Sequence, residues 1–223
     1  GKQFILHGLE SKVRKAYLLA DDKKKPLAFE QTTDGDAGLH TLQLTLPARA
    51  PDKRASVVVL ETSGSPIVDP TLVQDGDGLI TLEAFTGQIQ QPAGTAAMTR
   101  GRWGTIEQWL SSRNRVTWQV KVAQPGIYDV CVLTQTESDG KWEGGHRMKV
   151  SVGRQSAAAV AKKTELRDNP RATSYLQDVV SPLGQIEVKR AGLVEVTLKM
   201  EKIVKKKGIG PKLRAVQMVP VAE

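Results

Sequence analysis

The chain has 223 residues, of which 39% are hydrophobic and 25% are charged, as in ordinary folded globular proteins. This length predicts one or two domains, at roughly 150 residues per domain. No stretch approaches the roughly 18 consecutive apolar residues that a membrane-spanning helix needs, so we expect no membrane span. The formal net charge of +8 permits anionic partners without identifying one, and no nucleic-acid partner is predicted.

Several kinds of chemistry are excluded by residues that the chain lacks. Cys131 is the single cysteine, which excludes an internal disulfide and a cysteine-based zinc site. Three histidines make a histidine-rich metal site unexpected. The sequence contains no Walker loop, nucleophile elbow or HExxH zinc motif. The chain also begins with Gly1 rather than Met, within patterned sequence, which predicts a fragment of a longer parent protein.

Residues 1–62 have the pattern of short strands separated by turns. Strands are predicted at 4–6, 13–19, 26–31 and 41–46. In the last of these, leucines alternate with polar residues, the period of a half-buried strand. A fifth strand, SVVVLE at 56–61, is a continuous apolar run, typical of a strand that is covered on both faces.

Residues 63–77 are predicted to form an exposed linker, because Gly, Ser and Pro interrupt the apolar pattern there. The sequence Asp75-Gly-Asp77-Gly invites comparison with a calcium-binding loop. An EF-hand would need Asp or Asn at its fifth position, Gly at its sixth and Glu at its twelfth; this chain has Leu79, Ile80 and Thr86 there. A turn is therefore the prediction for residues 75–78.

Residues 78–223 repeat the strand-and-turn pattern. In RVTWQVKV, Trp118 alternates with valines on one face, which predicts that it lies in the core. Further strands are predicted after the turn at Gln124-Pro125-Gly126 and in RMKVSVG, GQIEVK, LVEVTLKM and KLRAVQMVPV. GTIEQWLSS is the main helical candidate, at about two turns, and AAAVAKK fits a helix or a strand. We predict an all-β fold of two β-sandwich units, the second jelly-roll-like.

Tryptophan supplies the candidate ligand contacts. Trp103, Trp109 and Trp142 stand in polar or Gly-rich surroundings, where an indole can stack on a sugar ring while polar neighbours bond its hydroxyls. The alternative is that each one fills the end of its own sandwich. Loop 135–146 is the best candidate for a carbohydrate site: Trp142 would stack, and Glu143 and His146 would bond hydroxyls. Trp103 is a second candidate.

Catalysis is not expected of this chain. Glycoside hydrolysis ordinarily needs two carboxyl groups held roughly 5–10 Å apart. Asp139 and Glu143 share one loop, but no pattern marks them as buried or oriented. No catalytic residue is therefore assigned.

The first part of the chain resembles a known family on an ordered set of motifs. AYLLAD (16–21), LAFEQ (27–31) and LPARAPDKRASVVVLE (46–61) occur in the order seen in the small C-terminal β-domain of glycoside hydrolase family 29, the α-L-fucosidases. The resemblance covers residues 3–62. It implies an accessory region whose catalytic barrel would lie before residue 1 of this chain, in an extracytoplasmic parent.

The remainder, 78–223, is similar to carbohydrate-binding modules of families 6 and 35, through ITLEAFTGQI, VTWQVKVAQPGIYDVCVL and LRAVQMVPV. Those modules often hold a structural calcium ion with acids on the first and last strands. Glu83 fits that pattern, but Phe85 and Arg214 stand where further acids are usual. These departures weigh against calcium, and no cofactor is predicted.

The resemblance implies a non-catalytic fragment that binds or positions fucosylated glycan, with carbohydrate and the parent's own catalytic barrel as partners. Two alternatives stay open. The chain is a purely structural or oligomerisation region without a ligand, or it is a basic module for anionic polysaccharide, through Lys205, Lys206 and Lys207 in the 202–214 segment. The sequence does not specify the oligomeric state.

Overall fold

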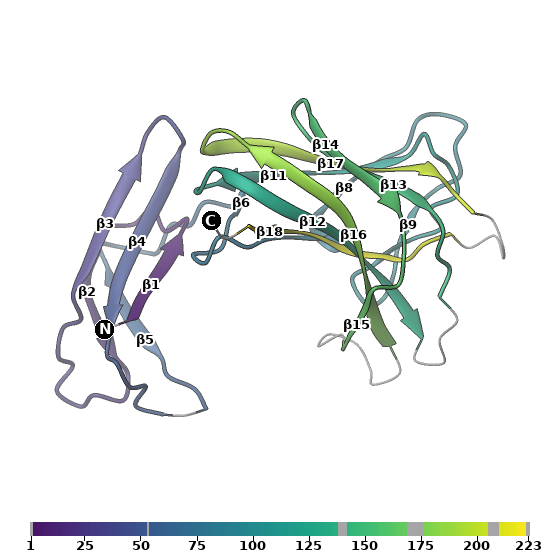
Figure 1. Cartoon of the computed structure of the whole chain (residues 1–223). Coiled ribbons are helices and arrows are strands. Elements are labelled where there is room, and N and C mark those ends of the chain that lie inside the picture. Colours follow the sequence, from purple (N-terminus) through teal and green to yellow (C-terminus); the bar gives the residue numbers. More distant parts are fainter. Residues whose placement is uncertain (1, 53, 138–141, 169–175, 205–209, 222–223) are drawn as a thin grey trace. The chain divides into compact units, whose positions relative to one another are not determined.

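The computed structural model describes residues 2–52, 54–137, 142–168, 176–204 and 210–221 (Figure 1). Strands dominate these residues, and a single-turn 3₁₀ helix, η1 (Ala84–Thr86), is the one helical element among them. The all-β prediction is confirmed. None of these residues belongs to a helix with the length and hydropathy of a membrane span.

The chain divides into two compact units. The first comprises 1–78 with the short segments 121–123 and 191–193; the second comprises 79–120, 124–190 and 194–223. The boundaries predicted from sequence, 1–62, 63–77 and 78–223, stay a prediction.

The first unit is built on two small antiparallel sheets. Its strands are β1 (Lys2–His7), β2 (Val13–Leu18), β3 (Phe29–Asp34), β4 (Leu39–Leu46), β5 (Val58–Thr62) and β6 (Leu72–Val73). One sheet has the order β1-β4-β3, and the other pairs β2 with β5. Leu42 and Leu44 of β4 pack with Val13 and Ala16 of β2 in one buried cluster, so the core lies between these two sheets. The alternation predicted for 41–46 is confirmed.

The second unit holds the longer strands. They are β7 (Ile80–Glu83), β8 (Gln88–Gln90), β9 (Thr99–Arg100), β10 (Ile106–Glu107), β11 (Arg115–Val122), β12 (Gly126–Glu137), β13 (Arg147–Val152), β14 (Gln155–Val160), β15 (Glu165–Asp168), β16 (Leu176–Val188), β17 (Gly192–Lys202) and β18 (Leu213–Pro220). One sheet has the order β15-β16-β12-β18-β10-β9, with β7 also paired to β18. A second sheet contains β14-β13-β17-β11, with β8 paired to β11.

The two larger sheets pack face to face, because β13 and β14 of one contact β16 of the other (Figure 1). Trp118 is 2% exposed and its valine neighbours on the same face of β11 are buried, which confirms the predicted core stripe. The core position of Trp118 is also fixed by a hydrogen bond from its Nε1 to the Glu83 carbonyl oxygen, at 2.9 Å. This bond joins β11 of one sheet to β7 of the other.

Two local predictions are wrong. GTIEQWLSS forms no helix: it contains the two-residue strand β10, and Trp109 beyond it is completely buried. Burial of the Trp109 side chain in the core favours an extended backbone here, and this tertiary contact outweighs the weak helix propensity of the segment. The run 56–61 is also not covered on both faces, because Val58, Val59 and Leu60 in β5 are only half-buried.

Candidate functional site

Trp142 is held by its own surroundings in a defined orientation. Its ring is half-buried, and its Nε1 donates a hydrogen bond of 2.9 Å to Oγ1 of Thr134, a buried residue of β12. A Cβ atom at Gly144 would overlap the six-membered part of the indole. Gly144 therefore lies against the six-membered part of the ring, and the residue as a whole is only half-buried.

Glu143 is the polar neighbour of that indole. Its side chain is half-buried, and its Oε2 is buried without a hydrogen-bond donor among the residues that the structure describes. A carboxylate oxygen in that state has an unused acceptor site, and a ligand hydroxyl would reach it only if the atom became exposed. Asp139, the other acid of the predicted loop, lies outside the described residues.

His146 lies in the interior. Its ring has no exposed surface, and its Nδ1 accepts a hydrogen bond from the Val204 backbone N–H at 3.1 Å. Burial lowers the pKa of His146, although the backbone carbonyl and the charge of Glu143 act in the opposite direction. The predicted contact with hydroxyls would require this ring to become exposed, and it stays an untested prediction.

Trp103 lies in the tight turn between β9 and β10. Its ring is half-buried, and the guanidinium of Arg102 sits 5.1 Å from its centroid. The next residue, Gly104, has φ +74°, and a Cβ there would lie 3.4 Å from Cδ1 of Phe85. Phe85, in η1, is 44% exposed, so an accessible aromatic ring lies beside this turn. In the sequence, Phe85 stands out only as a residue in place of an acid, and no local pattern marks it as a ligand contact.

The predicted site residues thus fall in two loops. Trp142, Glu143 and His146 share the segment that precedes β13, and Trp103 belongs to the β9–β10 turn. Trp109, the remaining candidate, is wholly buried and behaves as the alternative interpretation expects.

Glu83, the one acid that matches the calcium-holding pattern of the resembling modules, is paired with an arginine in the structure. Glu83 at the end of β7 stands opposite Ala215 in β18, and its Oε2 receives a hydrogen bond of 2.5 Å from Nη1 of Arg214. A guanidinium thus provides the positive charge beside Glu83. Among the described residues there is no cluster of three acidic, histidine or cysteine side chains that could hold a metal ion.

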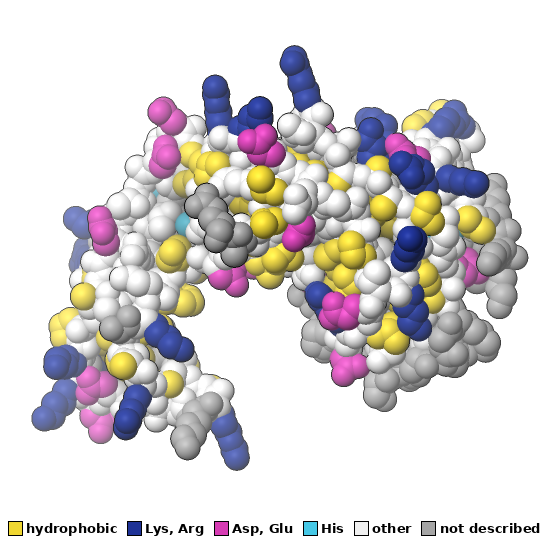
Figure 2. All heavy atoms as spheres, in the orientation of Figure 1, with side chains coloured by type: hydrophobic (Ala, Val, Ile, Leu, Met, Phe, Trp, Pro, Cys, Tyr) yellow, Lys and Arg dark blue, Asp and Glu magenta, His cyan; other side chains and the backbone are white. Residues whose placement is uncertain are grey.

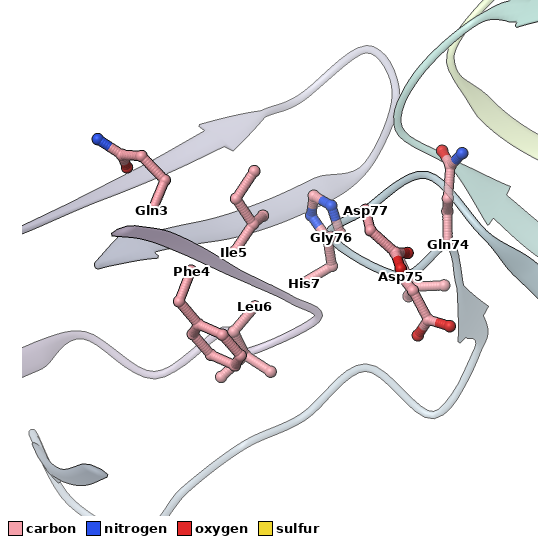
Figure 3. A pocket seen from close by; sticks show the side chains of 10 residues that line it. Gln3, Phe4, Ile5, Leu6, His7, Gln74, Asp75, Gly76 and Asp77 are labelled. Carbon is pink, nitrogen blue, oxygen red and sulfur yellow. The ribbon is translucent and has the colours of Figure 1, made fainter. Parts of the chain in front are cut away.

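The first unit contains a separate open pocket of about 670 Å³ (Figure 3). It is lined by β1 from Gln3 to His7 and by Val73 to Asp77. Figure 3 shows His7 and the turn that starts at Asp75 at the same end of this pocket. The turn predicted at 75–78 is confirmed by the Gly78 N–H, which donates to the Asp75 carbonyl at 2.9 Å.

Burial shifts the pKa of two titratable groups of that pocket, His7 and Asp75. It lowers the pKa of His7, against the charge of Asp75, and it raises the pKa of Asp75, with Asp77 adding to the rise. His7 Nδ1 is already engaged with Thr41 Oγ1 at 3.0 Å, which limits what the ring can offer a ligand. This pocket is not predictable from the sequence, because its lining residues form no motif and come from a strand and a turn that are far apart in the chain.

No family model matches the chain, and no curated protein matches it. Among solved structures, it is similar to an α-L-fucosidase from Vibrio sp. strain EJY3, with a TM-score of 0.64 and 19% identity. That match covers 98% of this chain but only 36% of the fucosidase chain. At this identity the match shows a shared fold.

Two further structures are more distant. A GH26-CBM35 β-(1,4)-mannanase of Podospora anserina has a TM-score of 0.40 and 15% identity, over 66% of this chain and 28% of that one. An exo-β-1,3-galactanase of Phanerochaete chrysosporium has a TM-score of 0.38 and 15% identity, over 73% and 37%. Matches with TM-scores this low do not indicate a shared fold. The resemblance to part of an α-L-fucosidase, predicted from the sequence motifs, is confirmed at the level of the fold.

Proposed function

We propose that this chain is a non-catalytic accessory region of an α-L-fucosidase-type glycoside hydrolase, and that it binds or positions fucosylated glycan. The observation that carries the proposal is the pairing of Trp142 with Glu143. A half-exposed indole is backed by Gly144, and an acceptor oxygen without a described donor stands next to it in sequence. The fold shared with part of a fucosidase supports the same class of ligand.

The chemistry suits a sugar. The apolar face of a pyranose packs on an indole, and its hydroxyls bond to nearby polar groups. Base–aromatic stacking is worth roughly 1–3 kcal/mol per base, and a sugar face, being less polarizable, should lie at or below the lower end of that range. Trp103, which is half-buried, is a second candidate for this kind of contact, and the exposed ring of Phe85 lies beside Gly104 of the same turn.

The wider functional context follows from the same proposal. The partner in the parent protein would be its catalytic barrel, and the location would be periplasmic or secreted. A purely structural or oligomerisation role is the alternative if no glycan binds. Binding of anionic polysaccharide through Lys205, Lys206 and Lys207 is another alternative, and these lysines lie outside the described residues.

Calorimetric titration of the purified chain with fucosylated oligosaccharides tests the proposal. We expect Trp142→Ala to weaken binding about five-fold or more, since 1.4 kcal/mol is a factor of ten in affinity. Trp103→Ala tests the second candidate ring separately from the first. Unchanged affinity in Trp142→Ala would refute the assignment, and an unfolded Trp142→Ala variant would identify the ring as a core residue. Affinity that collapses at high salt would favour the anionic polysaccharide instead.

Turnover is tested separately. The purified chain should release no chromophore from an aryl α-L-fucoside above the level of a mock purification. Activity that copurifies with the folded chain and persists after rechromatography would overturn the non-catalytic part of the proposal.

A further inference from the structure

A small pocket of about 190 Å³ lies on one face of the larger sheet of the second unit. Strand register shows that its lining residues share that face. Glu83 and Thr81 of β7 pair with Ala215 and Gln217 of β18, and Ala215 in turn pairs with Leu133 of β12. Ile80 and Leu82 of β7 alternate with Thr81 and Glu83 and are buried. The pocket therefore opens on the face of the sheet opposite the core.

Arg214 reaches this face through an irregularity in β18. Along β12, Leu133 pairs with Ala215 and the next residue, Thr134, pairs with Leu213. Arg214 is thus the extra residue of a β-bulge, and bulges redirect side chains in this way. The bulge places a charged side chain in the pocket wall, although only 4% of the residue is exposed.

The guanidinium of Arg214 is only partly satisfied. Its Nη1 donates to Glu83, but its Nε is buried with no hydrogen-bond partner among the described residues. Asp178 on β16 places its Oδ2 3.9 Å from that Nε. This separation exceeds a direct hydrogen bond, yet one oxygen atom at about 2.8 Å from each group would bridge them.

The rest of the pocket is preorganised. The Arg167 side chain makes two hydrogen bonds to Glu165, of 2.7 and 3.0 Å, and a third of 3.1 Å to Oε1 of Gln217. Leu133 and Ala215 supply an apolar floor and pack with Val180 in one buried cluster. Apolar carbon beside fixed polar groups is the composition of a small-ligand site.

We propose that this pocket is a second binding site, for one ring of a neutral polyhydroxylated ligand such as a pyranose. A hydroxyl bridges Arg214 and Asp178, accepting from Nε–H and donating to Oδ2. Carboxylates and guanidinium groups line the pocket together, so an anion meets Glu83 and Asp178, and a cation meets Arg167 and Arg214. The volume lies below the roughly 300–1,000 Å³ of pockets for larger ligands, which suits a single ring.

The test follows the Arg214 Nε–H resonance in ¹H–¹⁵N spectra of the intact chain. Methyl pyranosides, including methyl α-L-fucopyranoside, and myo-inositol are titrated in turn. At least one of them should shift this resonance saturably, while sodium acetate and methylammonium chloride at matched concentration should not. A resonance that no polyol moves, or that acetate moves equally, would overturn the proposal and leave water as the occupant.

Variants separate this site from the loop that carries Trp142. Asp178→Asn should weaken polyol binding about five-fold to tenfold, because a charged acceptor becomes neutral. Glu187→Gln removes an exposed carboxylate from the same strand and should leave binding unchanged. Trp142→Ala should also leave the Nε–H response unchanged, so failure of either site is distinguishable from failure of the other. If Asp178→Asn does not fold, Gln217→Met provides the second measurement, with an expected loss of about threefold or more. Equal binding by the folded variant and the wild-type chain would contradict the assignment.

Discussion

The indole N–H of Trp142 donates to Thr134 Oγ1 over 2.9 Å, and thereby ties the candidate loop to the buried side of β12. Thr134→Val keeps the shape of the side chain but removes the acceptor. We expect the free energy of unfolding to fall by about 1 kcal/mol in urea titrations, and glycan affinity to fall with it because the ring loses its anchor. Thr99→Val, on an exposed strand, is the control and should change neither quantity.

Gly144 provides a second way to test the same ring. A methyl group at this position overlaps the indole, so Gly144→Ala should displace Trp142 while leaving it in the chain. Affinity for fucosylated glycan should drop about as far as in Trp142→Ala, and tryptophan fluorescence should change. Gly35→Ala is the control, because a Cβ there meets nothing within 4 Å. Full affinity in Gly144→Ala would show that the ring orientation is irrelevant to binding.

Gly76 is predicted to be essential to the first unit. A Cβ at this position would lie 2.6 Å from the Ile5 carbonyl oxygen and 2.8 Å from its Cβ, and backbone atoms cannot yield as a flexible side chain does. Gly76→Ala should therefore destabilise the first unit by about 1–3 kcal/mol. Hydrogen exchange of β1 and β4 amides should accelerate while that of β12 amides stays unchanged. Equal protection of β1 in the variant and in the wild-type chain would contradict this expectation.

Two histidines with lowered pKa, the buried His146 and the half-buried His7, predict an acid-sensitive fold. Burial lowers the pKa of His146 and of His7 below the value near 6.5 of an unfolded chain. The unfolded state therefore binds more protons as pH falls through this region, and stability is lost below about pH 6.5. Urea midpoints measured from pH 8 to pH 5 should decline over the lower half. His146→Asn, which retains an acceptor for the Val204 N–H, should flatten part of the decline.

The ion pair between Arg214 and Glu83 leads to a prediction about calcium. Because a guanidinium already neutralises Glu83, millimolar Ca²⁺ and EDTA should leave the melting temperature of the wild-type chain unchanged. Arg214→Met should cost about 2–3 kcal/mol, because the partly buried Glu83 carboxylate loses the charged hydrogen bond that it accepts from Nη1. Adding Glu83→Gln to that variant should restore part of the loss, as a double-mutant cycle would measure. A rise in the wild-type melting temperature on adding Ca²⁺ would contradict this account.

Much of the fold is predictable because apolar alternation is a strong local signal. The stripe around Trp118 and the leucines of β4 face the core as their spacing indicates. Weak signals fail when tertiary contacts decide the conformation. AAAVAKK had no clear period, and pairing with β13 makes most of it strand β14.

The candidate sites are less predictable, for two physical reasons. His146 and Glu143 lie three residues apart, yet His146 is buried and Glu143 is half-exposed. His146 contacts Val204, which is distant in the sequence, so its burial cannot be predicted from the local sequence. The pocket at Arg214 is assembled from five strands, and Arg214 faces it only because of the irregular register between β12 and β18. The available signal was that Arg214 is the one charged residue in the stretch LRAVQMV.

Because Arg214 is the extra residue of the bulge in β18, the position of its guanidinium depends on the number of residues in the strand as well as on the residue type. In a regular antiparallel ladder successive side chains point to opposite faces, so deleting one residue would move every residue before it to the other face. Deleting the extra residue of a bulge is different, because the residues on either side of it already alternate without it. Removing Arg214 would let Leu213 pair in regular succession beside Ala215 and would close the strand into an ordinary ladder. Conversely, exchanging Arg214 and Ala215 would preserve composition while placing the guanidinium opposite Glu83 in the regular ladder. Insertions and deletions near the start of β18 are therefore expected to remove or restore the pocket more completely than most substitutions do.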